Sequence, residues 1–183
     1  VLSSVMQFAM LPLQGLGQGA QPIISYNYGA KNAERVKKAF RLLLTASLCY
    51  SVTLWALVMA VPQAFVMMFN TNEALVSYTI PALRIYLGAL LLFGIQVACQ
   101  MTFTSMGNAL ASVIVAVVRK FVLLLPLIYI MPLIFTADKA TAVFMAEPVA
   151  DTIAVLFTAI LFFFQFRRFM SKMNAADKEK TNT

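Results

Sequence analysis

Glutamine side chains recur at helical spacing in the first thirty residues, within a segment that carries no charge. Gln14, Gln18 and Gln21, with Gln7 before them and Ser25 after them, are seven, four, three and four residues apart, which places them on one face of a helix. Such a stripe in an apolar segment must face water or other polar groups, because unpaired amides are costly in hydrocarbon. We interpret it as the wall of a solvated cavity. The alternative is that the amides bond to neighbouring helices, at typically about 1 kcal/mol each.

A second polar stripe follows in the third apolar segment. Gln96, Gln100 and Thr104 are each four residues apart, and Phe93 and Tyr86 fall near the same face. Amide and aromatic side chains together can hold a large apolar cation, through cation–π attraction and adaptable packing. The alternative is ordinary core packing with two buried amides.

Two acids occur in the last apolar segment. Glu147 and Asp151 are one helical turn apart and flank Pro148, which is common in the first turn of a helix. Acids at a helix N-terminus are stabilised by the helix dipole, so capping is one interpretation. The other is a site for a cation or a proton that is open to the outside.

Three basic residues lie within or beside apolar segments. We expect Arg84 to extend its guanidinium to the outer interface, and Arg119 and Lys120 to lie at the cytoplasmic interface.

The sequence lacks most of the residue types and motifs that enzymes use for catalysis. The chain has no His and two Cys, and it lacks a nucleophile elbow, a CxxC pair and a phosphate-binding glycine loop. We therefore expect no enzymatic activity, no metal site and no cofactor.

The elements that position these residues are predicted from composition. The 183 residues are 61% hydrophobic and 11% charged, and their mean hydropathy is +0.83. About 20 apolar residues cross a bilayer as a helix. The uncharged runs predict an all-α membrane protein with five transmembrane helices, at about 3–28, 42–62, 77–104, 110–135 and 147–166.

The positive charges predict the orientation. All of the 14 Lys and Arg residues except Arg84 and Lys139 lie in segments 31–41, 119–120 and 167–180, which fall on one side if the helices alternate. Lysine and arginine in short loops stay in the cytoplasm. The C-terminus is therefore predicted to be cytoplasmic. The net charge of +7 reflects this orientation rather than a nucleic-acid partner.

Two segments lie outside the predicted spans. Residues 29–41 read as an amphipathic helix on the inner membrane surface, capped by Asn32, with Val36 and Phe40 on its apolar side. Contact with membrane lipids is expected there. Residues 171–183 are polar and are predicted to be a disordered cytoplasmic tail.

Several stretches of the chain resemble one family. The stretch from Leu13 to Val36, with its Gln-Pro…Tyr-Asn-Tyr-Gly-Ala core, is similar to the eighth helix and following loop of bacterial multidrug and toxic compound extrusion (MATE) transporters. Three more stretches resemble later parts of these proteins, and together they cover about residues 5–170. They are Ser105-Met-Gly-Asn108, Leu125-Pro-Leu-Ile-Tyr129 and Glu147-Pro-Val-Ala-Asp151.

The resemblance implies a twelve-helix exporter of two six-helix lobes, with the substrate cavity between them. Residues 1–170 would form part of the C-terminal lobe, helices eight to twelve. The chain begins at Val1 directly in an apolar run, which we interpret as a piece of a longer protein. The missing N-terminal lobe would be its partner, in a multi-pass protein of the bacterial inner (plasma) membrane.

The implied activity is exchange of organic cations, drugs or dyes against sodium or protons, by alternating access between the lobes. Two departures leave the coupling ion open. Residues 77–104 contain no acid, whereas some sodium-coupled members carry one in helix ten. The N-terminal lobe, which holds the coupling acid in other members, is not in this sequence. From the two polar stripes, Gln14, Gln18, Gln21, Gln96 and Gln100 are the substrate-cavity candidates. Glu147 and Asp151 are the candidates for ion coupling.

Two alternative functions follow from the same residues. A flippase of lipid-linked saccharides, from the same superfamily, would gather Arg and Lys for phosphates, and Arg84 is the one candidate. A non-transporting membrane subunit would not need polar stripes in two spans.

Overall fold

The computed structural model describes residues 2–68, 73–134 and 139–181, and these residues contain helices and no strand. The helices are α1 (Leu2–Gly29), α2 (Ala33–Ala60), α3 (Pro62–Met67), α4 (Glu73–Tyr86), α5 (Leu90–Ser105), α6 (Ala109–Val117), the π-helix η1 (Val118–Leu124), α7 (Leu125–Ile134) and α8 (Lys139–Thr181). The prediction of an all-α membrane protein is confirmed. The charge pattern also predicts that segments 63–76 and 136–146 face outward, and of these segments residues 69–72 and 136–138 lie outside the described residues.

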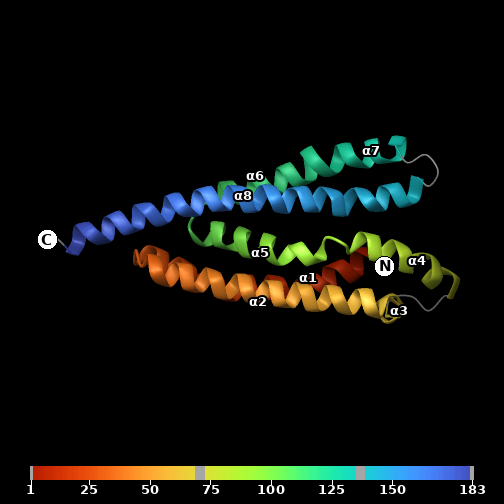
Figure 1. Cartoon of the computed structure of the whole chain (residues 1–183), viewed down its shortest axis with the longest axis horizontal. Helices are drawn as coiled ribbons and strands as arrows, with labels where there is room; N and C mark the ends of the chain where they lie inside the picture. Colours follow the sequence, from red (N-terminus) through yellow and green to blue (C-terminus); the bar gives the residue numbers. More distant parts are fainter. Residues whose placement is uncertain (1, 69–72, 135–138, 182–183) are drawn as a thin grey trace.

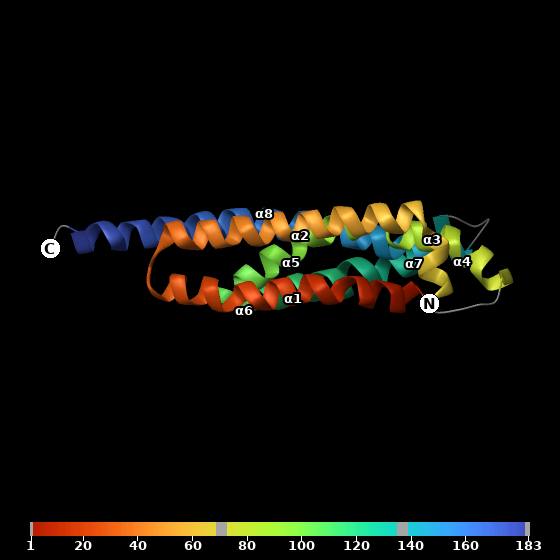
Figure 2. The ribbon, with the colours of Figure 1, turned by 90° about the horizontal axis from the view of Figure 1, so that it is seen from below.

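The long helices lie side by side along one axis (Figure 1). α5 packs most extensively against α2 and also contacts α1 and α8, so it lies at the centre. α6, η1 and α7 run along α8 as one interrupted helix, and α1 lies against α2 and α5 (Figure 2).

Small residues allow α2 and α5 to approach closely. A Cβ atom added at Gly94 would lie 2.7 Å from the carbonyl oxygen of Ser47 and 2.9 Å from the hydroxyl of Ser51. Ser47 and Ser51 are fully buried in this contact. Small side chains at the interface are the usual means by which membrane helices pack, because lipid supplies no hydrophobic force to bring helices together.

An aromatic cluster joins α2, α5 and α8 near the C-terminal part of α8. The ring centroids of Phe40 and Phe162 are 4.7 Å apart, and those of Phe103 and Phe162 are 5.2 Å apart. Val36 is also fully buried.

This cluster includes the apolar side of the predicted amphipathic segment 29–41. The structure turns at residues 30–31, Asn32 caps α2 by accepting a hydrogen bond from the Arg35 amide at 3.0 Å, and α2 then continues to Ala60. The apolar side of the segment, with Val36 and Phe40, packs on protein. Aromatic partners on α8, distant in the sequence, provide that packing.

Three helices within the described residues are long and apolar enough to cross a membrane: Ala33–Ala60, Ser112–Leu133 and Met145–Met173. A fourth span is possible if Leu75–Tyr86 and Leu90–Ser105, bent by 47° at a short break, act together. The predicted span 77–104 is therefore two helices, interrupted around Gly88. α1 has 28 residues, enough length to cross, but its glutamines lower its hydropathy.

α8 is longer than predicted at both ends. It begins at Lys139 rather than near residue 147, so Pro148 lies inside the helix. It also continues to Thr181, where we predicted disorder from residue 171. The added segments contain no Gly or Pro and several good helix formers, which favours continuation. The C-terminal end of α8 projects beyond the other helices (Figure 1).

Candidate substrate cavity

The two glutamine stripes meet at one cavity of about 720 Å³. α1 and α5 supply most of the wall, and η1 supplies one residue. All five glutamines predicted from the sequence line it. The complete lining is Met10, Gln14, Gln18, Gln21, Phe93, Gln96, Val97, Gln100, Met101, Thr104 and Arg119.

The α1 stripe divides into two functions along the helix. Gln14, Gln18 and Gln21 line the cavity, whereas Gln7 lies outside the lining set. Ser25, at the end of the stripe, donates a hydrogen bond to the carbonyl of Ser105 at 2.9 Å. The stripe therefore forms a cavity wall in its middle and a link between helices at its end.

The α5 side of the cavity is the more buried side. Gln96 is 5% exposed, and no described residue donates a hydrogen bond to its side-chain oxygen Oε1. A buried amide oxygen without a donor is energetically costly, which makes Gln96 an acceptor available to a ligand or a water molecule. Phe93 and Val97 supply apolar surface beside it.

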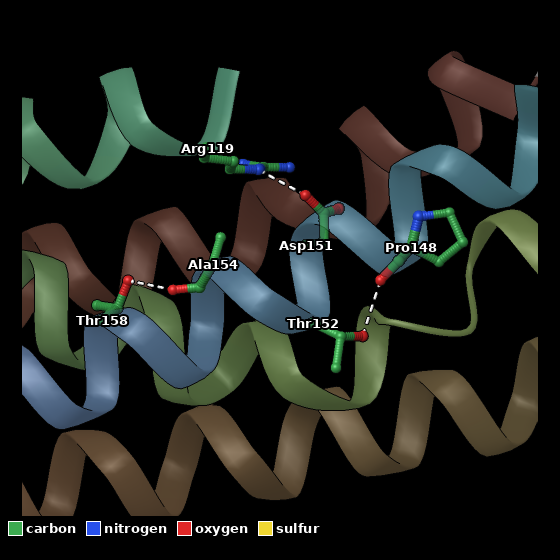
Figure 3. A network of polar contacts seen from close by, with 6 residues as sticks. All are labelled: Arg119, Pro148, Asp151, Thr152, Ala154 and Thr158. Atoms are coloured by element: carbon green, nitrogen blue, oxygen red, sulfur yellow. Dashed lines mark hydrogen bonds and ion pairs between the residues drawn. The ribbon is translucent and has the colours of Figure 1, made fainter. Parts of the chain in front are cut away.

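An ion pair adjoins the cavity, because Arg119 both lines the cavity and contacts Asp151 (Figure 3). Nε of Arg119 donates to Oδ1 of Asp151 at 2.5 Å. The side chain of Asp151 is 3% exposed and that of Arg119 is 24% exposed. The guanidinium also lies 5.3 Å from the centre of the Phe93 ring, within the range of a cation–π contact.

One expectation about this ion pair is corrected. Arg119 lies in the helical segment that forms the candidate span Ser112–Leu133. Asp151 lies in the interior of α8, so it does not cap a helix N-terminus. Each charge is tolerated between apolar helices because the other compensates it.

A local widening of the helix carries Arg119. The backbone of residues 118–124 forms a π-helix, and the amide of Leu125 donates to the carbonyl of Lys120, five residues earlier. Pro126 follows immediately, and a proline ring clashes with the carbonyl four residues before it in a regular α-helix. The wider turns relieve that clash.

The hydroxyls of α8 bond along the helix itself. Thr152 donates to the carbonyl of Pro148 and Thr158 donates to the carbonyl of Ala154, both at 2.7 Å (Figure 3). These bonds satisfy threonines inside an apolar span without a partner from another helix.

Glu147 occupies a different environment from Asp151. Its carboxylate lies beside the hydroxyl of Tyr86 and close enough to Asp151 to act on it electrostatically. Tyr86, which we placed near the face of the second stripe, lies outside the cavity lining. The described residues contain no group of three or more His, Cys, Asp or Glu side chains that could hold a metal ion.

Arg84 donates to the carbonyl of Met59 at 3.4 Å and lies outside the lining set.

Sequence reasoning missed Arg119 as a cavity residue, as well as Met10 and Met101. A signal for Arg119 was present, because a charged residue inside an apolar run marks a functional site with a partner. The methionines carry no such signal, since any apolar residue can fill a wall position.

A second, apolar hollow of about 690 Å³ lies between α1 and α2. Gly15 and Gly19 border it, and a Cβ atom added at either residue would meet no described atom within 4 Å. Within the described part of the chain, this pair does not form a helix–helix contact.

Comparison with known proteins adds three findings. The sequence model of the MatE family matches residues 1–130. The multidrug export protein MepA of Staphylococcus aureus is 26% identical over 131 residues, which are 72% of this chain and 29% of MepA. MepA of Staphylococcus haemolyticus is 23% identical over 163 residues, 89% of this chain and 35% of that protein. The chain thus spans about a third of the length of these curated relatives.

Solved structures share the fold. The MATE multidrug transporter DinF-BH, in a structure with a bound dye, is 30% identical with a TM-score of 0.78, over 87% of this chain and 35% of that one. A multidrug resistance MATE family transporter in its inward-facing conformation is 16% identical with a TM-score of 0.83, over 93% of this chain and 39% of that one.

Proposed function

The chain belongs to the MatE family, and from that membership we propose that it is the C-terminal part of a secondary active exporter of drugs, dyes and other organic cations. Under this proposal, an N-terminal lobe of the same protein completes the substrate cavity. The transporter lies in the inner membrane of a bacterium with its C-terminus in the cytoplasm.

The observation that carries the proposal is the convergence of five glutamines on one cavity with apolar and aromatic neighbours. Neutral amides can donate and accept hydrogen bonds in many arrangements. Phe93, Met10 and Met101 supply polarisable apolar surface that adapts to different shapes. This combination suits ligands that share a flat apolar body but differ in their polar groups.

The proposed mechanism is alternating access. In two-lobe transporters the substrate site lies near the middle of the membrane, and rocking of one lobe against the other exposes it to each side in turn. The cavity wall of α1 and α5 would form one side of that site. Downhill movement of sodium ions or protons would drive export, with Glu147 and Asp151 as the candidate coupling acids of this part.

A lipid-linked saccharide flippase is supported less well. Phosphate groups favour clusters of Arg and Lys. Among the described residues that line the cavity, Arg119 is the one basic side chain.

The proposal is tested with the complete transporter in liposomes. Rhodamine 6G is present at the same concentration inside and outside the vesicles, and a sodium or a proton gradient is imposed across them. We expect dye to move against its own gradient under one of the two ion gradients, and the movement to stop when an ionophore removes that gradient. Folded protein that moves no dye under either gradient would contradict the proposal.

A further inference from the structure

We propose that Arg119 forms a carboxylate-binding site within the cavity, so that this transporter takes amphiphilic molecules that carry a carboxylate together with a cationic or apolar body. The inference rests on the proposed export function and specifies which ligand group this part of the cavity recognises.

The charge distribution around the cavity is the first support. Among the described residues, the lining includes one charged side chain, Arg119, and no acid. Asp151 bonds to Arg119 but lies outside the lining set. The ion pair is therefore oriented, with its positive end at the cavity and its negative end buried in the contact with α8.

The fixed position of the guanidinium is the second support. Asp151 holds Nε, and the Phe93 ring lies 5.3 Å from the guanidinium carbon. A planar guanidinium presents its donors in a fork that matches the two oxygens of a carboxylate. Because Asp151 and Phe93 both restrict the Arg119 side chain, ligand binding does not lose the conformational entropy of ordering it.

Gln96 provides the third support. Its Oε1 is buried, lacks a donor among the described residues, and lies on α5 one turn after Phe93. A ligand that presents a carboxylate to Arg119 and an N–H or O–H group to Gln96 satisfies both. A purely cationic ligand satisfies Gln96 only and faces the positive end of the ion pair.

The test compares two dyes that differ at one group. Rhodamine 6G carries an ethyl ester, and rhodamine 19 carries the free carboxylic acid on the same ring system. Their dissociation constants for the complete, purified transporter are measured by fluorescence anisotropy near neutral pH. Export of both dyes is measured in parallel in the liposome assay.

The main variant is the double substitution Arg119→Gln with Asp151→Asn, which removes both charges and leaves no buried ion without a partner. We expect it to weaken binding of rhodamine 19 relative to rhodamine 6G by about tenfold or more, as expected for loss of a charge-assisted hydrogen bond. Arg119→Lys, which keeps the charge but not the fork, should give a smaller change in that ratio.

Lys120→Gln is the matched control, because it removes the neighbouring positive charge, which is exposed and outside the cavity lining. The ratio of the two dissociation constants should stay within about twofold of the unsubstituted protein, since no contact with the ligand is lost. A ratio that is equally unchanged in the Arg119→Gln/Asp151→Asn variant, at normal folding by size-exclusion chromatography, would overturn the inference. Export of rhodamine 6G by the unsubstituted protein would then leave the proposed function intact, whereas absence of export of either dye by the unsubstituted protein would contradict the function itself.

Discussion

Gln7 and Gln18 lie on the same helix, but Gln18 lines the cavity and Gln7 does not. A pair of variants tests whether this difference in position matters for transport. Replacing Gln18 with Leu in the complete transporter removes a polar group from the cavity. We expect resistance to individual cations to change by different amounts, up to about fivefold for a compound that loses one hydrogen bond. The measurement is inhibitory concentration for several unrelated cations at matched membrane expression.

Gln7→Leu is the control for this experiment, since Gln7 is exposed and lies outside the lining. Its resistance profile should match that of the unsubstituted protein. If Gln18→Leu lowered resistance to every compound in proportion to a loss of folded protein, the glutamine would be a structural link between helices and not part of a substrate wall.

At the scale of residues, the sequence predicted the glutamines and missed Arg119. The glutamines were accessible to prediction because their spacing follows the helical period, and membrane helices must turn such a face away from lipid. Arg119 and Asp151 are 32 residues apart, and their pairing depends on how two helices pack. Spacing within one helix carries no information on that contact.

At the scale of elements, the contact of α2 with α5 depends on Gly94. Substitution by Ala would place a methyl group 2.7 Å from the Ser47 carbonyl oxygen, which is backbone and cannot rotate away. We expect a loss of about 1 to 3 kcal/mol of stability, as for overpacked cores. Thermal unfolding of the purified complete protein in detergent measures the effect.

Gly15→Ala is the matched substitution for Gly94→Ala, because an added methyl group there meets no described atom within 4 Å. It should leave the unfolding temperature unchanged or raise it slightly, since alanine favours a helix over glycine. Equal destabilisation by both substitutions would show that the close approach of α2 and α5 is not what makes Gly94 necessary.

Apolar runs predicted which parts of the chain form long helices, but not where those helices break or end. The interruption around Gly88 lies within an apolar run, where no change of composition marks it. Arg119 and Lys120 mark the segment before Pro126 as unusual, but their charges do not predict that its backbone forms a π-helix. The extension of α8 to Thr181 was missed for the opposite reason, since polarity alone suggested disorder although the residues favour a helix. Both errors arise because hydropathy reports on the surroundings of a helix and not on its backbone.

At the scale of the whole molecule, the distribution of positive charge predicts which end of the bundle is cytoplasmic. Lys31 lies in the turn between α1 and α2, and Met68 lies at the end of α3, at the opposite end of the bundle (Figure 2). In a variant without Cys49 and Cys99, we expect a cysteine at Met68 to react with an impermeant maleimide in intact cells. A cysteine at Lys31 should react only after permeabilisation.

If the cysteine at Lys31 reacted in intact cells and the cysteine at Met68 did not, the orientation would be the opposite of the predicted one. Arg119 lies within the candidate span Ser112–Leu133, so we do not count it as a loop charge in this prediction. The basic residues before residue 42 and after residue 166 still fall at the same end.

The helical architecture followed from composition, whereas the placement of α5 at its centre did not, because nearly all of the runs are similarly apolar.

The π-helix has a consequence for the history of this chain. A π-helical turn corresponds to an α-helix that has gained one residue, so relatives without it should align with this sequence only when a one-residue gap is opened between residues 118 and 124. A single-residue deletion there would turn α7 by about 100° relative to α6, since each residue of an α-helix contributes that rotation. Insertions and deletions in this short window would therefore reset which face of α7 meets α8 while leaving the cavity wall of α1 and α5 untouched.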